Sequence, residues 1–335
     1  SCRARACGSG VRILVCGAGA VGARAARHLI ADAGIERVLL HDTDRKRQAA
    51  VVASLGERAE AVDEPEPAAA DLVLLASPAG RQSHLARRAV AAGRHVVSVA
   101  DSLGVVEGLL DLHAEARERR VTVAAGAGFG PGLSCVLARH AAGELDGVDE
   151  IHVARHGTGG PACARQHHHA LRGLALDWRE HSWRRRPAGS GRELCFFPDP
   201  IGGADCYRAV LPDTLLLVPA FPGASRVTAR LAATRRDRLT AGLPMLRRPH
   251  AEGRIGGLRV EVRGRRGPAR DTVVLGAVDR PAVAAGTVAA VTARWIASGQ
   301  ALATGAAGLA SLVEPLPFLH ELVRAGVSAA VFEGA

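Results

Sequence analysis

The most constraining feature of this 335-residue chain is a glycine-rich turn near its start. The apolar run 11–16 leads directly into Gly17-Ala18-Gly19-Ala20-Val21-Gly22, and an alanine-rich stretch that favours a helix follows. A second apolar run, 38–40, is closely followed by Asp42. A strand, a G-x-G-x-x-G turn, a helix, a second strand and a terminal acid, in this order, are typical of a dinucleotide-binding unit. The alternative is a glycine-rich turn with a purely structural role.

The three glycines of the turn have separate roles in such a unit. Gly17 permits the tight turn, Gly19 lets backbone N–H groups approach a pyrophosphate, and Gly22 lets the helix pack closely on the strand. The N-terminus of the helix presents its partial positive charge to the phosphates. We therefore expect the whole turn to contact the cofactor, namely Gly17, Ala18, Gly19, Ala20, Val21 and Gly22.

Charged residues after the second apolar run bear on the choice of cofactor. Asp42 would accept hydrogen bonds from the ribose hydroxyls and repel a 2′-phosphate, which favours NAD(H). Arg45, Lys46 and Arg47 lie close behind it and could hold such a phosphate, so NADP(H) stays open. Asp63 follows an expected third strand, where it is either an acceptor for the adenine amino group or a plain surface acid.

The order of apolar and polar segments predicts two domains. Apolar strands alternate with helices over about the first 140 residues, which predicts an α/β fold: a Rossmann-type doubly wound parallel sheet. Beyond the glycine-rich segment 128–132, hairpin-like strands predict a second α+β domain built on a mostly antiparallel sheet, with the run 215–218 as one strand. The expected boundaries are 1–140 for the cofactor domain and 141–304 for the substrate and dimerisation domain, with the tail 305–335 packing back on the first.

Composition excludes several classes of protein. The net charge is +10, but the arginines are dispersed and ten aromatic residues are few for stacking on bases, so we expect no nucleic-acid partner. No apolar run approaches the roughly 20 residues that cross a bilayer, so we expect no membrane partner. The seven cysteines are odd in number and never form C-x-x-C. They argue against a disulfide framework or a zinc knuckle and fit a cytoplasmic protein.

Four segments of the chain are similar to motifs of one enzyme family. They are G-A-G-A-V-G at 17–22, the strand–helix–strand run 71–101 with Ser77-Pro78 after its first strand, A-G-A-G-F-G-P-G-L at 125–133, and G-G-P-A at 159–162. With them the chain resembles the saccharopine dehydrogenase-like reductases, the group that includes saccharopine reductase and carboxynorspermidine synthase. The resemblance implies NAD(P)-dependent hydride transfer at an imine or secondary-amine centre of an amino-acid-like substrate.

The resemblance also implies where the site lies, although the good match covers only about the first 140 residues. The cleft would be bordered by Ser77 and Asp101, by the loop that starts at Gly128, and by the helix after residue 160. Ser77, Pro78 and Gly128 are expected beside the cofactor. Gly130 stands where the family often carries an acid, so no substrate role is expected there.

Asp101 and the run His167–His169 are the candidates for proton chemistry. Asp101 ends an expected parallel strand, where open α/β sheets place their ligand crevice; alternatively it caps the next helix or is a solvated acid. Adjacent helical residues are turned about 100° from one another, so the three histidines cannot all meet one ion, and no metal site is expected. One histidine would donate a proton or bind a carboxylate at the cleft, with His168 and His169 as the candidates. The alternative is a helix with one inward and two solvated histidines.

Two other residue types have weaker claims. Arg155 could clamp a substrate carboxylate, although chance placement is common in a chain so rich in arginine. Cys135 and Cys163 are interpreted as small buried residues, because no arrangement of cysteine, histidine and acid is visible in the sequence.

Together these features predict an NAD(P)-dependent oxidoreductase that acts on an amino-acid-like small molecule and forms a homodimer. Two alternatives remain: a reductase of an amino-acid semialdehyde or cyclic imine, and an NAD(P)-binding accessory protein without turnover.

Overall fold

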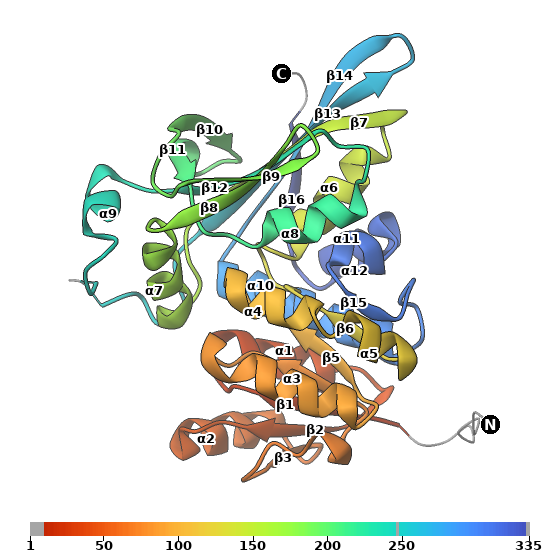
Figure 1. Cartoon of the computed structure of the whole chain (residues 1–335). Coiled ribbons are helices and arrows are strands. Elements are labelled where there is room, and N and C mark those ends of the chain that lie inside the picture. Colours follow the sequence, from red (N-terminus) through yellow and green to blue (C-terminus); the bar gives the residue numbers. More distant parts are fainter. Residues whose placement is uncertain (1–9, 246–247, 333–335) are drawn as a thin grey trace.

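The computed structural model describes residues 10–245 and 248–332 and contains two sheets (Figure 1). Residues 1–9 of the expected first domain and 333–335 of the expected tail lie outside these ranges. The first sheet and its helices form the lower half of Figure 1 and the second sheet forms the upper half, with α6 (Leu133–Ala142) and α12 (Pro315–Arg324) between them. Among the described residues, no helix is both long and apolar enough to cross a membrane.

The first sheet has seven strands, all parallel. Its strands, in spatial order, are β15 (Gly305–Ala307), β6 (Thr122–Ala124), β5 (His95–Ser98), β4 (Leu72–Leu75), β1 (Val11–Cys16), β2 (Ile35–His41) and β3 (Ala59–Ala61). The central strand β4 is buried along its whole length, as expected where helices cover both faces. The predicted Rossmann-type doubly wound sheet is confirmed.

Helices cover both faces of this sheet. They are α1 (Ala20–Ile30), α2 (Arg45–Leu55), α3 (Gln82–Ala91), α4 (Leu103–Leu110) and α5 (His113–Glu118), joined from late in the sequence by α10 (Pro281–Ala297). Helix α10 packs against α1 so closely that a Cβ on Gly286 would lie 2.7 Å from Cβ of Arg24. A segment within the expected second domain therefore packs on the first sheet.

The second sheet is mostly antiparallel, as predicted. Its strands are, in order, β10 (Glu193–Phe197), β11 (Gly202–Arg208), β12 (Arg226–Ala232), β7 (Gly147–His156), β13 (Gly256–Arg266), β14 (Ala269–Asp279) and β16 (Ala329–Phe332), and β8 (Leu174–Arg179) and β9 (Ser182–Pro187) form a hairpin beside β12. The pair β12–β7 is parallel. The tail is thus divided, since β15 extends the first sheet and β16 extends the second.

One predicted strand is wrong. The run 215–218 lies in helix α8 (Asp213–Leu217) and the 3₁₀ turn that follows it. Leu216 and Leu217 are buried there. A short apolar run fits a buried helical turn as well as a strand, so periodicity alone does not separate the two.

Three further helices complete the second half of the chain, namely α7 (Pro161–Ala170), α9 (Arg235–Thr240) and α11 (Leu309–Leu312). The main hydrophobic core runs without a break from the first sheet through α6 and α10 to β13 of the second sheet. Helix α6 is largely buried and packs on β13 and β14 of the second sheet and on α11 and α12.

Candidate functional site

The glycine turn is fixed by two close backbone contacts. Gly17 has φ +111°, and a Cβ there would lie 2.7 Å from the backbone carbon of Ala76; a Cβ on Gly22 would lie 1.8 Å from the carbonyl oxygen of Gly17. At Gly19 a Cβ would meet nothing within 4 Å. The turn therefore packs tightly against neighbouring backbone at Gly17 and Gly22, whereas Gly19 faces open space.

Helix α1 begins at this open side. No described side chain caps it at Gly19, so its first N–H groups are not satisfied by a cap. A helix N-terminus of this kind favours an anion such as a pyrophosphate. The expected contact residues Ala18, Ala20 and Val21 lie in the same segment, between the turn and the first turn of α1.

Asp42 lies beside the glycine turn and is 7% exposed. Its Oδ2 accepts a hydrogen bond from the backbone N–H of Ala18 at 2.6 Å, and its Oδ1 accepts from the N–H of Asp44 at 2.8 Å and from Arg47 at 2.9 Å. Burial opposes ionisation, but these hydrogen bonds and the charge of Arg47 lower the pKa of Asp42 below its ordinary value. An ionised acid thus stands at the ribose end of the expected cofactor groove, with Arg47 already on one oxygen.

Arg45 and Asp63 interact with each other. The guanidinium of Arg45 lies 3.2 Å from the Asp63 carboxylate and donates to the Asp63 carbonyl at 2.8 Å. The carboxylate is 95% exposed. Both residues lie near the edge of the first sheet that carries Asp42, where they are available to an adenosine group.

The other expected cofactor residues lie at strand ends of the same sheet. Ser77 and Pro78 follow β4, and the carbonyl of Ser77 accepts a hydrogen bond from Gln82 of α3. Gly128 forms a tight turn with Pro131 and Gly132, in which the Gly128 N–H donates to the Pro131 carbonyl at 2.9 Å. Gly132 has φ +123°, and a Cβ there would lie 2.2 Å from the Gly128 oxygen.

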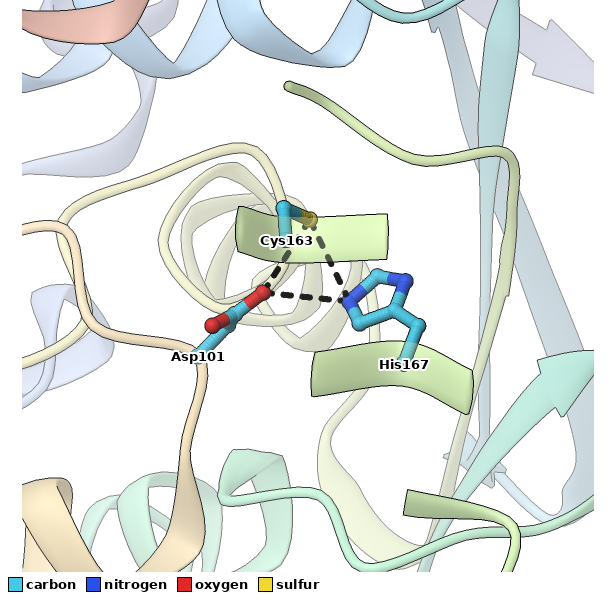
Figure 2. A group of neighbouring side chains, drawn as sticks. All are labelled: Asp101, Cys163 and His167. Atoms are coloured by element: carbon cyan, nitrogen blue, oxygen red, sulfur yellow. Dashed lines mark hydrogen bonds and ion pairs between the residues drawn. The ribbon is translucent and has the colours of Figure 1, made fainter. Parts of the chain in front are cut away.

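A compact cluster of three side chains joins the two halves of the molecule (Figure 2). Oδ2 of Asp101 lies 3.1 Å from Nε2 of His167 and 3.2 Å from Sγ of Cys163, and Sγ lies 3.7 Å from Nε2. The backbone N–H of Gly159 also donates to Sγ at 3.4 Å. Asp101 follows β5, whereas Cys163 and His167 lie one helical turn apart on α7. We call these three residues the Asp–Cys–His cluster.

The cluster holds opposite charges in a buried place. Burial opposes protonation of His167, but the charges of Cys163 and Asp101 and the hydrogen bonds to both outweigh it and raise the pKa of His167 to about 10. Burial alone would raise the pKa of Asp101, yet its bond to His167 and the charges of His167 and Arg155 lower it. The side chain of His167 is 8% exposed and that of Asp101 is 22% exposed. The two side chains are thus largely buried together, and the acid is the more exposed of the pair.

The histidines chosen from the sequence lie elsewhere. Nε2 of His168 interacts with the carbonyl of Thr240 at 2.8 Å, and His169 is exposed. His167, which lies on the face of α7 toward Asp101, is the histidine that the fold brings to the acid. The sequence held a signal for this arrangement: Cys163 and His167 are spaced i, i+4 and so share one face of a helix.

Arg155 is not free to clamp a substrate. It forms a buried ion pair with Asp213 and donates to the carbonyl of Gly130, while Asp213 also accepts from Ser134 at 3.1 Å. The side chains of Arg155 and Asp213 are 2% and 0% exposed. Arg155, which lies in strand β7, therefore connects the Gly128–Gly132 turn to the second sheet. It lies near enough to Asp101 for its charge to act on that carboxylate.

The two cysteines singled out from the sequence differ. Cys135 is buried in α6, and burial raises the pKa of its thiol to about 12. Cys163 is partly exposed and belongs to the Asp–Cys–His cluster. An arrangement of cysteine, histidine and acid is thus present in the fold, although only the i, i+4 spacing of Cys163 and His167 signals it in the sequence.

Comparison with known proteins bears on the first half of this site. Residues 11–124, from β1 to β6, match the family described as "Oxidoreductase family, NAD-binding Rossmann fold". The first sheet has a Rossmann-type fold, and over these residues it is similar to the NAD-binding domains of that family. The family match covers about a third of the chain and does not extend to α7 or the second sheet.

Two solved structures are similar over nearly the whole chain. The apo saccharopine dehydrogenase (L-Glu forming) of Saccharomyces cerevisiae superposes with a TM-score of 0.69 at 14% identity, covering 96% of this chain and 100% of that one. The amine dehydrogenase of Mycobacterium smegmatis gives a TM-score of 0.53 at 13% identity, covering 91% and 97%. At these identities the likeness shows a shared fold.

Proposed function

We propose that the chain is an NAD(P)-dependent oxidoreductase that transfers a hydride at the C–N centre of an amino-acid-like substrate. The observation that carries the proposal is the pairing of Asp101 with the buried His167 at the carboxyl edge of the parallel sheet. Open α/β sheets bind their ligands at this edge. The saccharopine and amine dehydrogenase folds are compatible with C–N chemistry, although the substrate remains a proposal.

The residues near the glycine turn fit a dinucleotide. The open side at Gly19 leaves room for a pyrophosphate, the uncapped N-terminus of α1 favours its charge, and the ionised Asp42 suits ribose hydroxyls. When bound, the reduced cofactor supplies a hydride to the substrate carbon. NAD(H) is favoured by Asp42, and NADP(H) stays open because Arg45 and Arg47 lie beside it.

The Asp–Cys–His cluster would supply the proton that imine reduction requires. As the carbon receives a hydride, the nitrogen gains a proton and the C=N bond becomes CH–NH; the oxidative reverse needs a base for that proton. The imidazolium of His167 is the buried proton store, and Asp101, the more exposed of the two side chains, is its partner. In a semialdehyde reductase the same pair would protonate oxygen instead of nitrogen.

The direct test is turnover with matched histidine variants. NADH binding is followed by its fluorescence, and NADH oxidation is measured with a panel of oxo acids, each with and without an amine. We expect oxidation only when the amine is present. Asp101→Asn and His167→Gln should lower kcat by roughly 10²–10⁴-fold, because each removes a group that carries the proton. Cofactor affinity should change little, because the residues of the glycine turn are unaltered.

The control is His169→Gln, which alters an exposed histidine of the same helix and should keep the parent kcat. Oxidation of NADH by an aldehyde or a preformed cyclic imine without amine would favour the alternative reductase. NADH binding without oxidation by any member of the panel would favour an accessory protein. Equal kcat in all three variants would contradict the assigned proton path.

We also propose that the chain is a homodimer formed through the second sheet. The edge strand β10 exposes Leu194 and Phe196, at 58% and 59%, which is typical of a face that another chain covers. Sedimentation equilibrium of the parent and of a Leu194→Glu, Phe196→Glu variant tests this. A monomeric parent would contradict it.

A further inference from the structure

We propose that the Asp–Cys–His cluster binds one zinc ion through Oδ2 of Asp101, Sγ of Cys163 and Nε2 of His167, with a fourth position open. This inference rests on the proposed function, because the ion would lie where the proton chemistry is placed. It would take the place of the proton on Nε2 of His167, so the imidazolium belongs to the cluster without metal. Its test is metal binding, which does not depend on turnover.

The first argument is that three side-chain atoms able to bind zinc lie within 4.8 Å of one another. If the thiol is neutral, its S–H and the Nε2–H of His167 both donate to Oδ2 of Asp101. The third edge joins Nε2 to Sγ at 3.7 Å, where the sulfur is a weak acceptor that already accepts from the N–H of Gly159. If the thiol is ionised, Sγ and Oδ2 become two anions 3.2 Å apart. A cation at the centre is attracted to all three atoms and removes this conflict.

The second argument is the size of the triangle. Zinc bonds of about 2.3 Å to sulfur and about 2.0–2.1 Å to nitrogen and oxygen, at tetrahedral angles, separate N from O by about 3.3 Å and S from either of them by about 3.5–3.6 Å. The corresponding distances here are 3.1, 3.2 and 3.7 Å. To accept the ion, Oδ2 would have to move away from Nε2 and Sγ by about 0.2–0.4 Å, and Sγ would have to move toward Nε2 by about 0.1–0.2 Å.

The donor set selects the type of metal. One thiolate, one imidazole and one carboxylate match zinc, whereas magnesium and calcium prefer oxygen alone. The two anionic donors neutralise the charge of the ion. Three protein donors with one open position are typical of a catalytic rather than a structural zinc site. A substrate oxygen or nitrogen is the natural fourth donor.

The competing interpretation is a nucleophilic triad, and the geometry argues against it. In such a triad the acid holds one ring nitrogen of the histidine while the nucleophile meets the other. Here Asp101 and Cys163 approach the same atom, Nε2 of His167 (Figure 2). Nδ1 of His167 is buried and has no hydrogen-bond partner in the described part of the chain. Coordinating histidines usually donate this second N–H, so we expect a weaker site than one with such an acceptor.

The experiment is titration of the chelator-treated full chain with Zn²⁺ by calorimetry and with Co²⁺ by absorption. We expect one ion per chain and a thiolate-to-cobalt charge-transfer band. Cys163→Ser should abolish the band, and Cys163→Ser, His167→Gln and Asp101→Asn should each weaken Zn²⁺ binding at least tenfold. Zn²⁺ should also raise the Tm of the parent, because the ion joins the segment after β5 to α7.

The matched control is His169→Gln, which should bind Zn²⁺ like the parent, and circular dichroism checks that each variant is folded. Absence of binding by the folded parent, or binding unchanged in all three ligand variants, would overturn the site. The two proposals fail separately. A parent that oxidises NADH but binds no zinc loses only the metal site, and one that binds zinc but turns over no substrate loses only the proposed reaction.

Discussion

The glycine turn and the Asp–Cys–His cluster border the same edge of the parallel sheet but are built in different ways. The turn is one continuous segment, and backbone contacts to Gly17 and Gly22 determine its shape. The cluster joins Asp101 to a side chain 62 residues later, Cys163, across two sheets. Local geometry can be inferred from local sequence, whereas the cluster exists only because the fold places α7 beside the segment that follows β5.

This difference predicts where substitutions will affect folding. In the turn, the binding function lies at the open residue Gly19 and the structural role lies at its neighbours. Near the Asp–Cys–His cluster, the structural role lies in the buried ion pair of Arg155 and Asp213. The charge of Arg155 acts on Asp101, but Arg155 is not a member of the cluster.

Asp213→Ala should cause the largest loss of stability. It leaves the guanidinium of Arg155 buried without its partner, which costs about 3–5 kcal/mol in the free energy of unfolding. Asp205→Ala is the control, because Asp205 pairs with Arg192 at a site where the arginine is 70% exposed, and such pairs contribute about 0–1 kcal/mol. Urea unfolding of the two variants checks this. An equal loss of free energy of unfolding in the two variants would show that the Arg155–Asp213 pair does not stabilise the fold around the Gly128–Gly132 turn.

Gly22→Ala and Gly19→Asp should have opposite consequences. A Cβ at residue 22 meets the Gly17 oxygen at 1.8 Å, so Gly22→Ala should lower the free energy of unfolding by about 3 kcal/mol. Gly19→Asp meets no atom within 4 Å but places a carboxylate where the pyrophosphate would approach. It should leave the stability unchanged and weaken NADH binding at least about 100-fold, which corresponds to about 2.7 kcal/mol.

Thermal unfolding and fluorescence titration of both variants measure this separation, with Gly19→Ala as the control for stability alone. Undiminished NADH affinity in folded Gly19→Asp would remove the basis for placing the cofactor at the turn. A stable Gly22→Ala variant would mean that α1 can shift away from β1 more easily than the close contact suggests.

The sequence predicted the first sheet and the type of the second sheet because their signals are periodic and local. The run into Gly17–Gly22 and the alternation that follows determine a parallel sheet, and hairpin-like runs determine the antiparallel one. The run 215–218 was assigned wrongly because four apolar residues have too little periodicity to separate helix from strand. The position of α10 on the first sheet could not be predicted, because its alanine-rich sequence is apolar on nearly every side.

The candidate site was only partly predictable for a similar reason. Asp101 was found because it follows a parallel strand, and strand ends have a known place in such folds. The choice among His167, His168 and His169 depends on the rotation of α7, which the sequence does not determine. The i, i+4 spacing of Cys163 and His167 was available, but a spacing on one helix indicates a shared face and not what that face meets.

The smallest predicted effect concerns the choice between the two cofactors. In the structure Arg47 donates to Oδ1 of Asp42 at 2.9 Å, and the same oxygen is suited to a ribose hydroxyl. NADH binding should therefore displace Arg47 from Asp42, whereas NADPH would use Arg47 and be repelled by Asp42. Asp42→Ser should shift the ratio of the two Kd values toward NADPH by about tenfold, or about 1.4 kcal/mol. Arg47→Ala should shift it toward NADH. Fluorescence titration of both cofactors against both variants measures the ratio. Tighter binding of NADPH than of NADH by the parent chain would mean that the arginines, and not Asp42, determine the preference.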